Sequence, residues 1–109
     1  NLENNLDVKE AIITQVQSDR WLGAICAAPA ILGHMGLLKG KKYTCFPTFD
    51  EAAFGGTYQE TAAVQDGKLV TGRGMGATMA FACLLLKNFV DGAVLKQVAY
   101  GMQYSIAKL

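Results

Sequence analysis

Cys26 is the residue whose type and setting could do chemistry. A short apolar run, Trp21 to Ile25, predicts a buried strand that ends at this cysteine. An Ala-rich segment with helical spacing follows, so the cysteine is expected at a strand-to-helix nucleophile elbow. N–H groups at the start of that helix would stabilise the thiolate, which is the reactive form. We therefore predict a functional thiol, although a lone cysteine in an apolar segment is more often a core residue.

No partner for this thiol can be identified from the spacing. His34 is the only histidine and stands eight positions after Cys26 in the same predicted helix, which is about 12 Å along the axis. It is therefore predicted to be a surface histidine at the helix end, and an intact Cys-His pair is excluded. Glu51 and Glu60 are alternative partners that nothing in the spacing distinguishes, and exposed loop carboxylates are the simpler description of both.

The other two cysteines suggest neither a disulfide framework nor a metal site. The chain has three cysteines, an odd number that favours a protein of the reducing cytoplasm. Their positions lack the spacing of metal ligands, so no metal site is predicted. Cys83 lies in an apolar segment and is predicted to be core. Cys45 is either an inert buried thiol or a secondary thiol that resolves oxidised Cys26.

Composition narrows the function classes. The chain has 109 residues, 51% of them hydrophobic and 17% charged, with a net charge of +1, which fits one globular domain. Such a charge gives no case for nucleic acid or an anionic membrane surface. No apolar run approaches the roughly 20 residues that cross a bilayer.

The elements before the middle of the chain follow from apolar spacing and caps. Asn1 to Asn5 is polar and predicts a loop, with Asn5 as the N-cap of an amphipathic helix over Leu6 to Ser18 that packs on a sheet. The helix after Cys26 has Pro29 in its first turn and ends at Gly36. A strand over Lys42 to Cys45 and a short helix over Asp50 to Phe54 complete this part.

The second part of the chain has the clearest strand signal. Thr61 to Val64 and Lys68 to Thr71 are β-prone runs joined by a turn that contains Asp66-Gly67, which predicts a hairpin. A buried helix over about Ala77 to Val90 follows, and Asp91 caps a last amphipathic helix. The loop from Gly72 to Gly76 lacks the spacing of a phosphate-binding motif and is predicted to wall the thiol pocket instead.

Three segments in this order resemble the ThiJ/PfpI superfamily, in its deglycase branch: AICAAP at 24–29, YTCFP at 43–47 and DGKLVTGRGMGA at 66–77. The resemblance implies a flavodoxin-like α/β sandwich with a mostly parallel sheet, of which residues 1–109 are the C-terminal portion. It implies that the N-terminal strands, a Gly-Gly loop and a glutamate that hydrogen-bonds the cysteine precede the region seen here. The polar, strandless beginning of the chain gives the same expectation.

The resemblance also implies roles for individual residues. Cys26 would be the reactive, easily oxidised cysteine, and Ala27 would supply a backbone N–H to an oxyanion hole. Met75 replaces the usual proline of its loop, and Ala27 stands where the protease branch has histidine. The residues expected to line the pocket are Phe46, Pro47, Gly72, Arg73, Gly74 and Met75.

The function that the resemblance implies is a cofactor-independent glyoxalase or deglycase. It would act through Cys26 on small reactive aldehydes such as methylglyoxal, or on their early adducts, as a cytoplasmic homodimer. The alternative is a redox-sensing stress-response protein or chaperone whose cysteine oxidises to sulfinate. A thiamine-biosynthesis type or intracellular-protease-like member is less favoured, because Ala27 removes the protease dyad. A glutamine amidotransferase ranks lowest, since no histidine follows His34.

Overall fold

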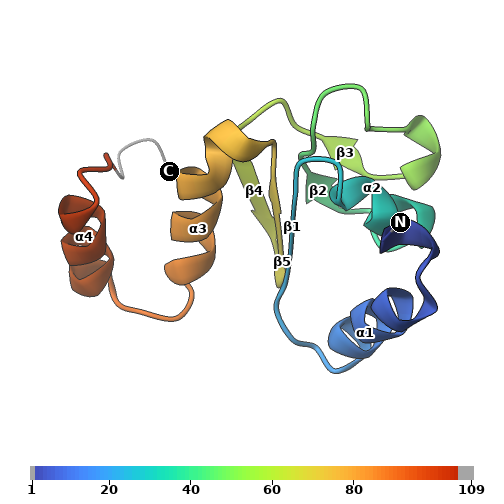
Figure 1. Ribbon diagram of the computed structural model, residues 1–109, viewed down its shortest axis with the longest axis horizontal. Helices are drawn as coiled ribbons and strands as arrows, with labels where there is room; N and C mark the ends of the chain where they lie inside the picture. Colours follow the sequence, from blue (N-terminus) through green and yellow to red (C-terminus); the bar gives the residue numbers. More distant parts are fainter. Residues whose placement is uncertain (1, 106–109) are drawn as a thin grey trace.

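The computed structural model describes residues 2–105. A central sheet separates α3 and α4 on one side from α1, α2 and a small second sheet on the other (Figure 1). The elements in chain order are η1 (Leu2–Asn4), α1 (Leu6–Gln17), β1 (Leu22–Ile25), α2 (Pro29–His34), β2 (Lys42–Tyr43), η2 (Ala52–Phe54), β3 (Thr57–Tyr58), β4 (Ala63–Asp66), β5 (Leu69–Gly72), η3 (Met75–Ala77), α3 (Thr78–Leu86) and α4 (Gly92–Gly101).

The central sheet has the strand order β1-β5-β4. β1 and β5 run parallel, from the pair Leu22–Leu69 to the pair Ile25–Gly72. β4 and β5 form the predicted antiparallel hairpin, and β2 pairs in parallel with β3 in the second sheet. Two of these three pairings are parallel, as predicted for a flavodoxin-like α/β fold.

The helix caps were predicted correctly, but the burial of the first helix was not. Asn5 Oδ1 accepts a hydrogen bond from the Val8 N–H at 3.1 Å, and Asp91 Oδ1 accepts one from the Val94 N–H at 2.9 Å. The helix α1 spans the predicted residues, yet none of its side chains is fully buried. Ile12 is half-buried against the core, whereas 40% of Val16 remains exposed.

Several boundaries differ from the predicted ones for local reasons. The first hairpin strand lies two residues later than expected and the second one residue later, because Gln65 and Asp66 pair with Val70 and Leu69 instead of forming the turn. Helix α2 ends at His34, before Gly36, and α3 begins at Thr78 after a 3-10 turn. The predicted N-terminal loop contains a 3-10 turn over Leu2–Asn4, and Asn1 lies outside the described residues.

Close packing of α3 on the central sheet depends on glycine. A Cβ atom on Gly72 would lie 2.8 Å from Ile25 Cγ1 and 3.0 Å from the Phe81 ring, and one on Gly23 would lie 2.9 Å from the same ring. Real Cβ atoms do not approach other atoms so closely, so the ring of Phe81 rests on glycine backbone. This contact seats α3 directly over the end of β5.

A buried side-chain bond joins the two sheets. Thr44 and Thr71 are fully buried, and the Thr44 N–H donates to Thr71 Oγ1 at 2.9 Å. The Thr44 hydroxyl in turn donates to the Thr61 carbonyl oxygen at 3.0 Å. The predicted strand over Lys42 to Cys45 therefore ends at Tyr43, because the next main-chain N–H bonds across to β5 instead of to β3.

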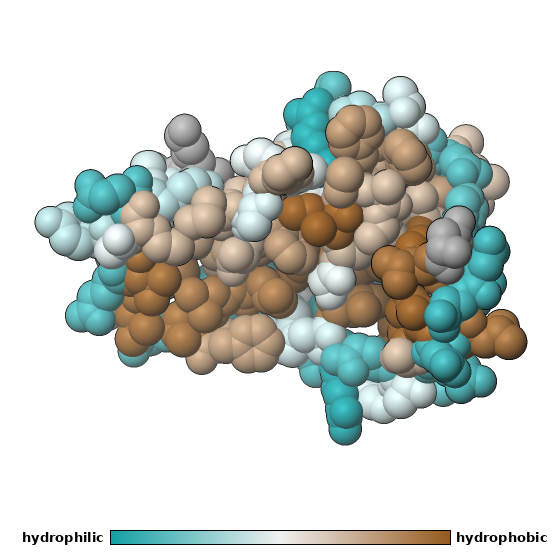
Figure 2. All heavy atoms as spheres, viewed as in Figure 1, coloured by the Kyte–Doolittle hydropathy of each residue, from teal (hydrophilic) through white to brown (hydrophobic). Residues whose placement is uncertain are grey.

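Apolar side chains also remain at the surface. They gather over α3, α4 and the loop between them (Figure 2); the exposed ones there are Phe89, Val94, Val98 and Met102. Within residues 2–105, no helix combines the length and apolarity needed to cross a bilayer.

We predict that Thr71→Val destabilises the chain by about 1–3 kcal/mol, because it leaves the buried Thr44 N–H without an acceptor. The free energy of unfolding in urea measures this loss. The matched control is Thr57→Val, the same change at an exposed strand position, which should stay within about 0.5 kcal/mol. Equal effects of the two substitutions would contradict the structural role of the Thr44–Thr71 bond.

Candidate functional site around Cys26

Cys26 occupies a sharp turn between β1 and α2, as predicted. Its φ angle is 65°, in the left-handed region that costs a non-glycine residue about 1–2 kcal/mol. Two main-chain hydrogen bonds hold it there: its N–H donates to the Gly72 carbonyl oxygen at 3.0 Å, and its carbonyl oxygen accepts from the Phe46 N–H at 2.7 Å. Strain held in this way is typical of a nucleophile elbow.

The thiol of Cys26 is half-buried and has no hydrogen-bond partner among residues 2–105. The helix begins three residues later than the cysteine, so its first turn is further away than the sequence suggested. In the intervening turn the Ala28 N–H is bonded to the Ile25 carbonyl oxygen at 3.1 Å, but the Ala27 N–H donates to no described residue. That free donor is the one expected to face an oxyanion.

One hollow beside the elbow brings together most of the predicted pocket residues. We call it the Arg73 hollow; it has a volume of about 540 Å³ and is lined by Phe46, Pro47, Ala62, Arg73, Gly74, Met75, Gly76 and Ala77. Met75 stands at its surface with 87% of its area exposed. Gly72 is instead buried in β5, where its carbonyl oxygen holds the Cys26 N–H.

A second hollow lies on the other side of the elbow. We call it the His34 hollow; its volume is about 560 Å³, and it is lined by Leu2, Glu3, Ala27, Ala28, Ala30, Ile31, His34, Thr48, Phe49 and Glu51. Phe46 lines the Arg73 hollow and Phe49 lines the His34 hollow. Their rings meet edge to face with centroids 6.0 Å apart, so the walls of the two hollows are in contact there. Cys26 is in neither lining. Its peptide bond leads to Ala27 of the His34 hollow, and its carbonyl oxygen accepts from the N–H of Phe46 in the Arg73 hollow.

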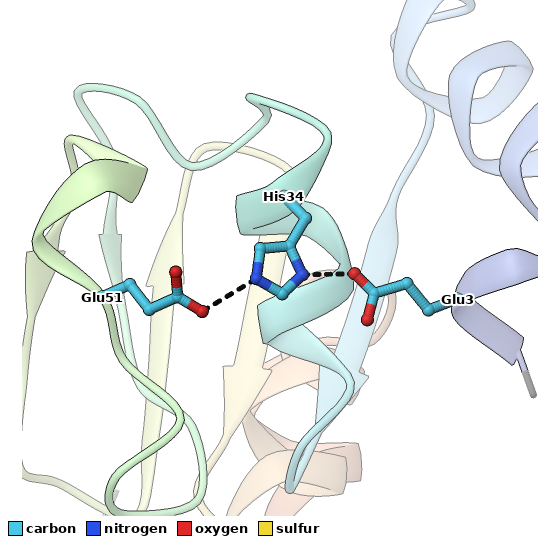
Figure 3. A network of polar contacts seen from close by, with 3 residues as sticks. All are labelled: Glu3, His34 and Glu51. Carbon is cyan, nitrogen blue, oxygen red and sulfur yellow. Dashed lines mark hydrogen bonds and ion pairs between the residues drawn. The ribbon is translucent and has the colours of Figure 1, made fainter.

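His34 is held between two carboxylates at the far end of α2 (Figure 3). Its Nε2–H donates to Glu51 Oε2 at 2.8 Å, and its Nδ1–H donates to Glu3 Oε2. Both bonds favour the imidazolium, so the hydrogen bond to Glu51, and next the one to Glu3, raise the pKa of His34 above 6.5. The histidine is exposed, as predicted, and neither of its bonds involves the thiol.

Comparison with known proteins identifies the family of this chain. Residues 1–88 match the DJ-1/PfpI family over most of the chain. The chain belongs to the DJ-1/PfpI family. It is 36% identical to protein DJ-1 homolog B of Arabidopsis thaliana over 99% of this chain and 27% of that protein. It is 33% identical to Protein DJ-1alpha of Drosophila melanogaster over 95% of this chain and 49% of that protein.

Solved structures confirm the fold. A mutant of a DJ-1 superfamily protein from Salmonella typhimurium superposes with a TM-score of 0.88 at 31% identity, over 96% of this chain and 58% of that one. The chain thus spans half or less of these two sequence relatives and somewhat more of the Salmonella chain. The family also includes enzymes: an isonitrile hydratase of Pseudomonas putida is 29% identical over 88% of this chain and 43% of its own length.

Neither carboxylate left open by the sequence reaches the thiol of this DJ-1/PfpI chain. Glu51 is bonded to His34, and Glu60 Oε1 lies 3.7 Å from Arg73 Nη2. The two carboxylate partners of His34 could not be found from the sequence, because Glu3 and His34 are 31 positions apart and His34 and Glu51 are 17 apart. Within residues 2–105, no three of the His, Cys, Asp and Glu side chains are grouped to hold a metal ion.

The remaining cysteines are buried. Burial raises the pKa of Cys45 to about 11, so its thiol is protonated and a poor nucleophile at neutral pH. Its side chain is fully enclosed, which weighs against a resolving role for it. Cys83 is equally enclosed in α3, as predicted for a core residue.

We predict that the pKa of His34, followed by NMR through its ring protons, falls most in Glu51→Gln and less in Glu3→Gln. Since the folded-state pKa is raised, the stabilisation is complete below about pH 6.5, the ordinary pKa of a histidine in an unfolded chain, and is lost as pH rises through the pKa of the folded state. Unfolding experiments across that range should show the loss. Glu10→Gln, on the exposed side of α1, is the control and leaves the titration unchanged; an equal shift in all three variants contradicts the assignment.

Proposed function

We propose that this DJ-1/PfpI chain carries the nucleophile of a glyoxalase or deglycase that acts on small reactive aldehydes such as methylglyoxal or their early adducts. The observation that carries the proposal is the strained, half-buried Cys26 with a free Ala27 N–H beside it. A thiol at an elbow adds to a carbonyl carbon, and a neighbouring N–H stabilises the oxygen that becomes negative. No cofactor is required.

The proposed reaction is an internal oxidation and reduction followed by hydrolysis. The Cys26 sulfur bonds to the aldehyde carbon of methylglyoxal, whose oxygen takes a proton to give a hemithioacetal. A proton then moves from that carbon to the neighbouring carbon, and the hydroxyl proton moves to the ketone oxygen, which oxidises the first carbon to a thioester and reduces the ketone to an alcohol. Water then cleaves the thioester, releasing lactate and the free thiol. The product equals methylglyoxal plus one water, so no outside oxidant is consumed.

The proton carrier in this proposal is a glutamate that residues 2–105 do not present to the thiol. Glu51 and Glu60 are engaged with His34 and Arg73, so neither is assigned the role. The family resemblance attributes it to a segment that would precede these residues. The relatives are longer than this chain, which spans 27% and 49% of them, so they have room for such a segment.

We assign the assembly as a homodimer whose domain is completed by that same segment. Two surfaces support this. Apolar side chains are exposed over α3 and α4 (Figure 2), and β1 pairs within the described residues with β5 alone, so its other edge is open. Open edges and large apolar patches are normally covered in a stable protein.

Lactate formation from methylglyoxal tests the proposed activity in the full-length protein. We expect Cys26→Ser to lower kcat/KM at least about 100-fold, because the hydroxyl is a far weaker nucleophile than a thiolate. The control is Cys83→Ala, which removes a buried thiol from α3 and should keep the activity. Equal lactate production by the wild-type protein and Cys26→Ser would refute the role of this thiol.

A stress-response role through oxidation of Cys26 is the second candidate. It is favoured by the same free Ala27 N–H, which can donate to an oxygen of a sulfinate. Two molecules of peroxide would carry the thiolate first to the sulfenic acid and then to the sulfinic acid, each reduced to water. In this role the elbow detects oxidant and need not turn over an aldehyde.

Mass spectrometry after mild peroxide treatment tests this role. We expect sulfinate on Cys26 at least about tenfold sooner than on Cys45 or Cys83, both of which are enclosed. The two buried thiols serve as internal controls in the same sample. Oxidation of Cys26 no faster than of Cys83 would remove the sensor role.

A further inference from the structure

We propose that Arg73 determines specificity at the Cys26 site by selecting electrophiles that carry an anionic group, a carboxylate or a phosphate. The inference rests on the nucleophilic thiol of the proposed function and names its substrate class: oxoaldehydes, or their adducts, with a negative charge near the reacting carbonyl. Neutral methylglyoxal, which lacks that charge, would then be a poorer substrate than the members of this class.

The strand register places Arg73 next to the nucleophile. Ile25 and Gly72 are partners at the ends of the parallel strands β1 and β5, so the next residues are Cys26 and Arg73. Adjacent strands lie about 5 Å apart, and the bond from the Cys26 N–H to the Gly72 carbonyl oxygen, at 3.0 Å, keeps the two chains together past the last pair. The Arg73 N–H is itself fixed by the Ala62 carbonyl oxygen at 2.9 Å.

The Arg73 side chain is the only charged group in the lining of its hollow. The other lining residues are glycines, alanines, Phe46, Pro47 and Met75. A guanidinium among apolar walls is the group best suited to recognise a planar carboxylate or a phosphate, because it donates two parallel hydrogen bonds. A small electrophile that enters here meets a single cation and no other charged lining group.

The present partner of Arg73 is weakly held. Glu60 Oε1 lies 3.7 Å from Arg73 Nη2, and 77% of the Glu60 side chain is exposed, against 39% for Arg73. That separation is too long for a hydrogen bond, and exposed ion pairs contribute little. The anionic group of a ligand can therefore replace Glu60 without losing a strong contact.

Two alkylating reagents test the proposal without any turnover. Iodoacetate and iodoacetamide react alike: the thiolate sulfur bonds to the methylene carbon, and iodide leaves. They differ only in a carboxylate against a neutral amide. We expect Arg73→Leu to lower the ratio of the iodoacetate rate to the iodoacetamide rate at Cys26 about three- to tenfold, measured by mass spectrometry on the full-length protein.

Lys68→Leu is the matched control. It removes the same charge just before β5, whereas Arg73 follows that strand, and five residues of strand place the two about 16 Å apart, beyond the screening length in physiological salt. Its rate ratio should equal that of the wild type. Glu60→Gln should raise the ratio about twofold or more, because it frees Arg73 and removes a negative charge. An equal ratio in Arg73→Leu and Lys68→Leu overturns the proposal.

The iodoacetamide rate reports whether each variant keeps the elbow intact. The variant Arg73→Lys retains the charge and should keep most of the wild-type ratio of the iodoacetate rate to the iodoacetamide rate. Protection of Cys26 from iodoacetamide by acetate or by inorganic phosphate, in the wild type and not in Arg73→Leu, then identifies the preferred anion. Protection by neither overturns the inference.

Lactate formation separates this inference from the proposed activity. A rate ratio that depends on Arg73 without lactate formation leaves anion selection standing and removes only the activity. Lactate formation together with a rate ratio that does not depend on Arg73 leaves the proposed activity standing and removes only the anion selection.

Discussion

The parallel pairing of β1 with β5 is the constraint on which the site depends. Because both strands run the same way, their carboxyl ends meet at one edge of the sheet, which is where open α/β sheets bind ligands. The last pair, Ile25 and Gly72, delivers Cys26 and Arg73 side by side. The same Gly72 carbonyl oxygen that ends the ladder accepts the Cys26 N–H, so the end of β1 supplies the proposed nucleophile, and the end of β5 supplies its restraint and its charged neighbour.

The short strands around this edge are held in place by hydrogen bonds to side chains more than by main-chain hydrogen bonds between strands. The strand β2 has only two residues, too few to be stable by its main-chain pairing alone. The Lys42 N–H is bonded to Asp66 Oδ2 at 2.8 Å, and the Thr44 N–H to Thr71 Oγ1 at 2.9 Å. These bonds anchor the chain just before Phe46, whose N–H then reaches the Cys26 carbonyl oxygen. The wall of the pocket and the strain at the elbow therefore depend on the same set of hydrogen bonds.

What the sequence could predict is the part set by local chemistry. The apolar run before Cys26, the caps at Asn5 and Asp91 and the turn signal of the hairpin each act within a few residues; the strand, the caps and the hairpin are present, although the turn lies at Gly67 and Lys68 and not at Asp66-Gly67. The burial of α1 could not be predicted, because periodicity reports a face without saying what covers it. The hydrogen bonds of His34 to Glu3 and Glu51 could not be predicted either, since the fold alone brings these residues together. The pocket residues came from family resemblance, and Gly72 differs because it ends a strand inside the sheet.

The charges on the two sides of Cys26 are unequal, and in the proposed reaction this inequality would orient a substrate. In the His34 hollow two carboxylates surround one imidazolium, so an added anion meets net negative charge. In the Arg73 hollow one guanidinium faces the cavity, with a single, distant and exposed carboxylate. An anionic group is therefore drawn toward Arg73, whereas Ala27, with its free N–H, belongs to the other side. Under the proposed function, a carbonyl carbon at Cys26 would have its oxygen toward Ala27 and its charged end toward Arg73, so the electrostatics and the oxyanion donor would favour the same orientation.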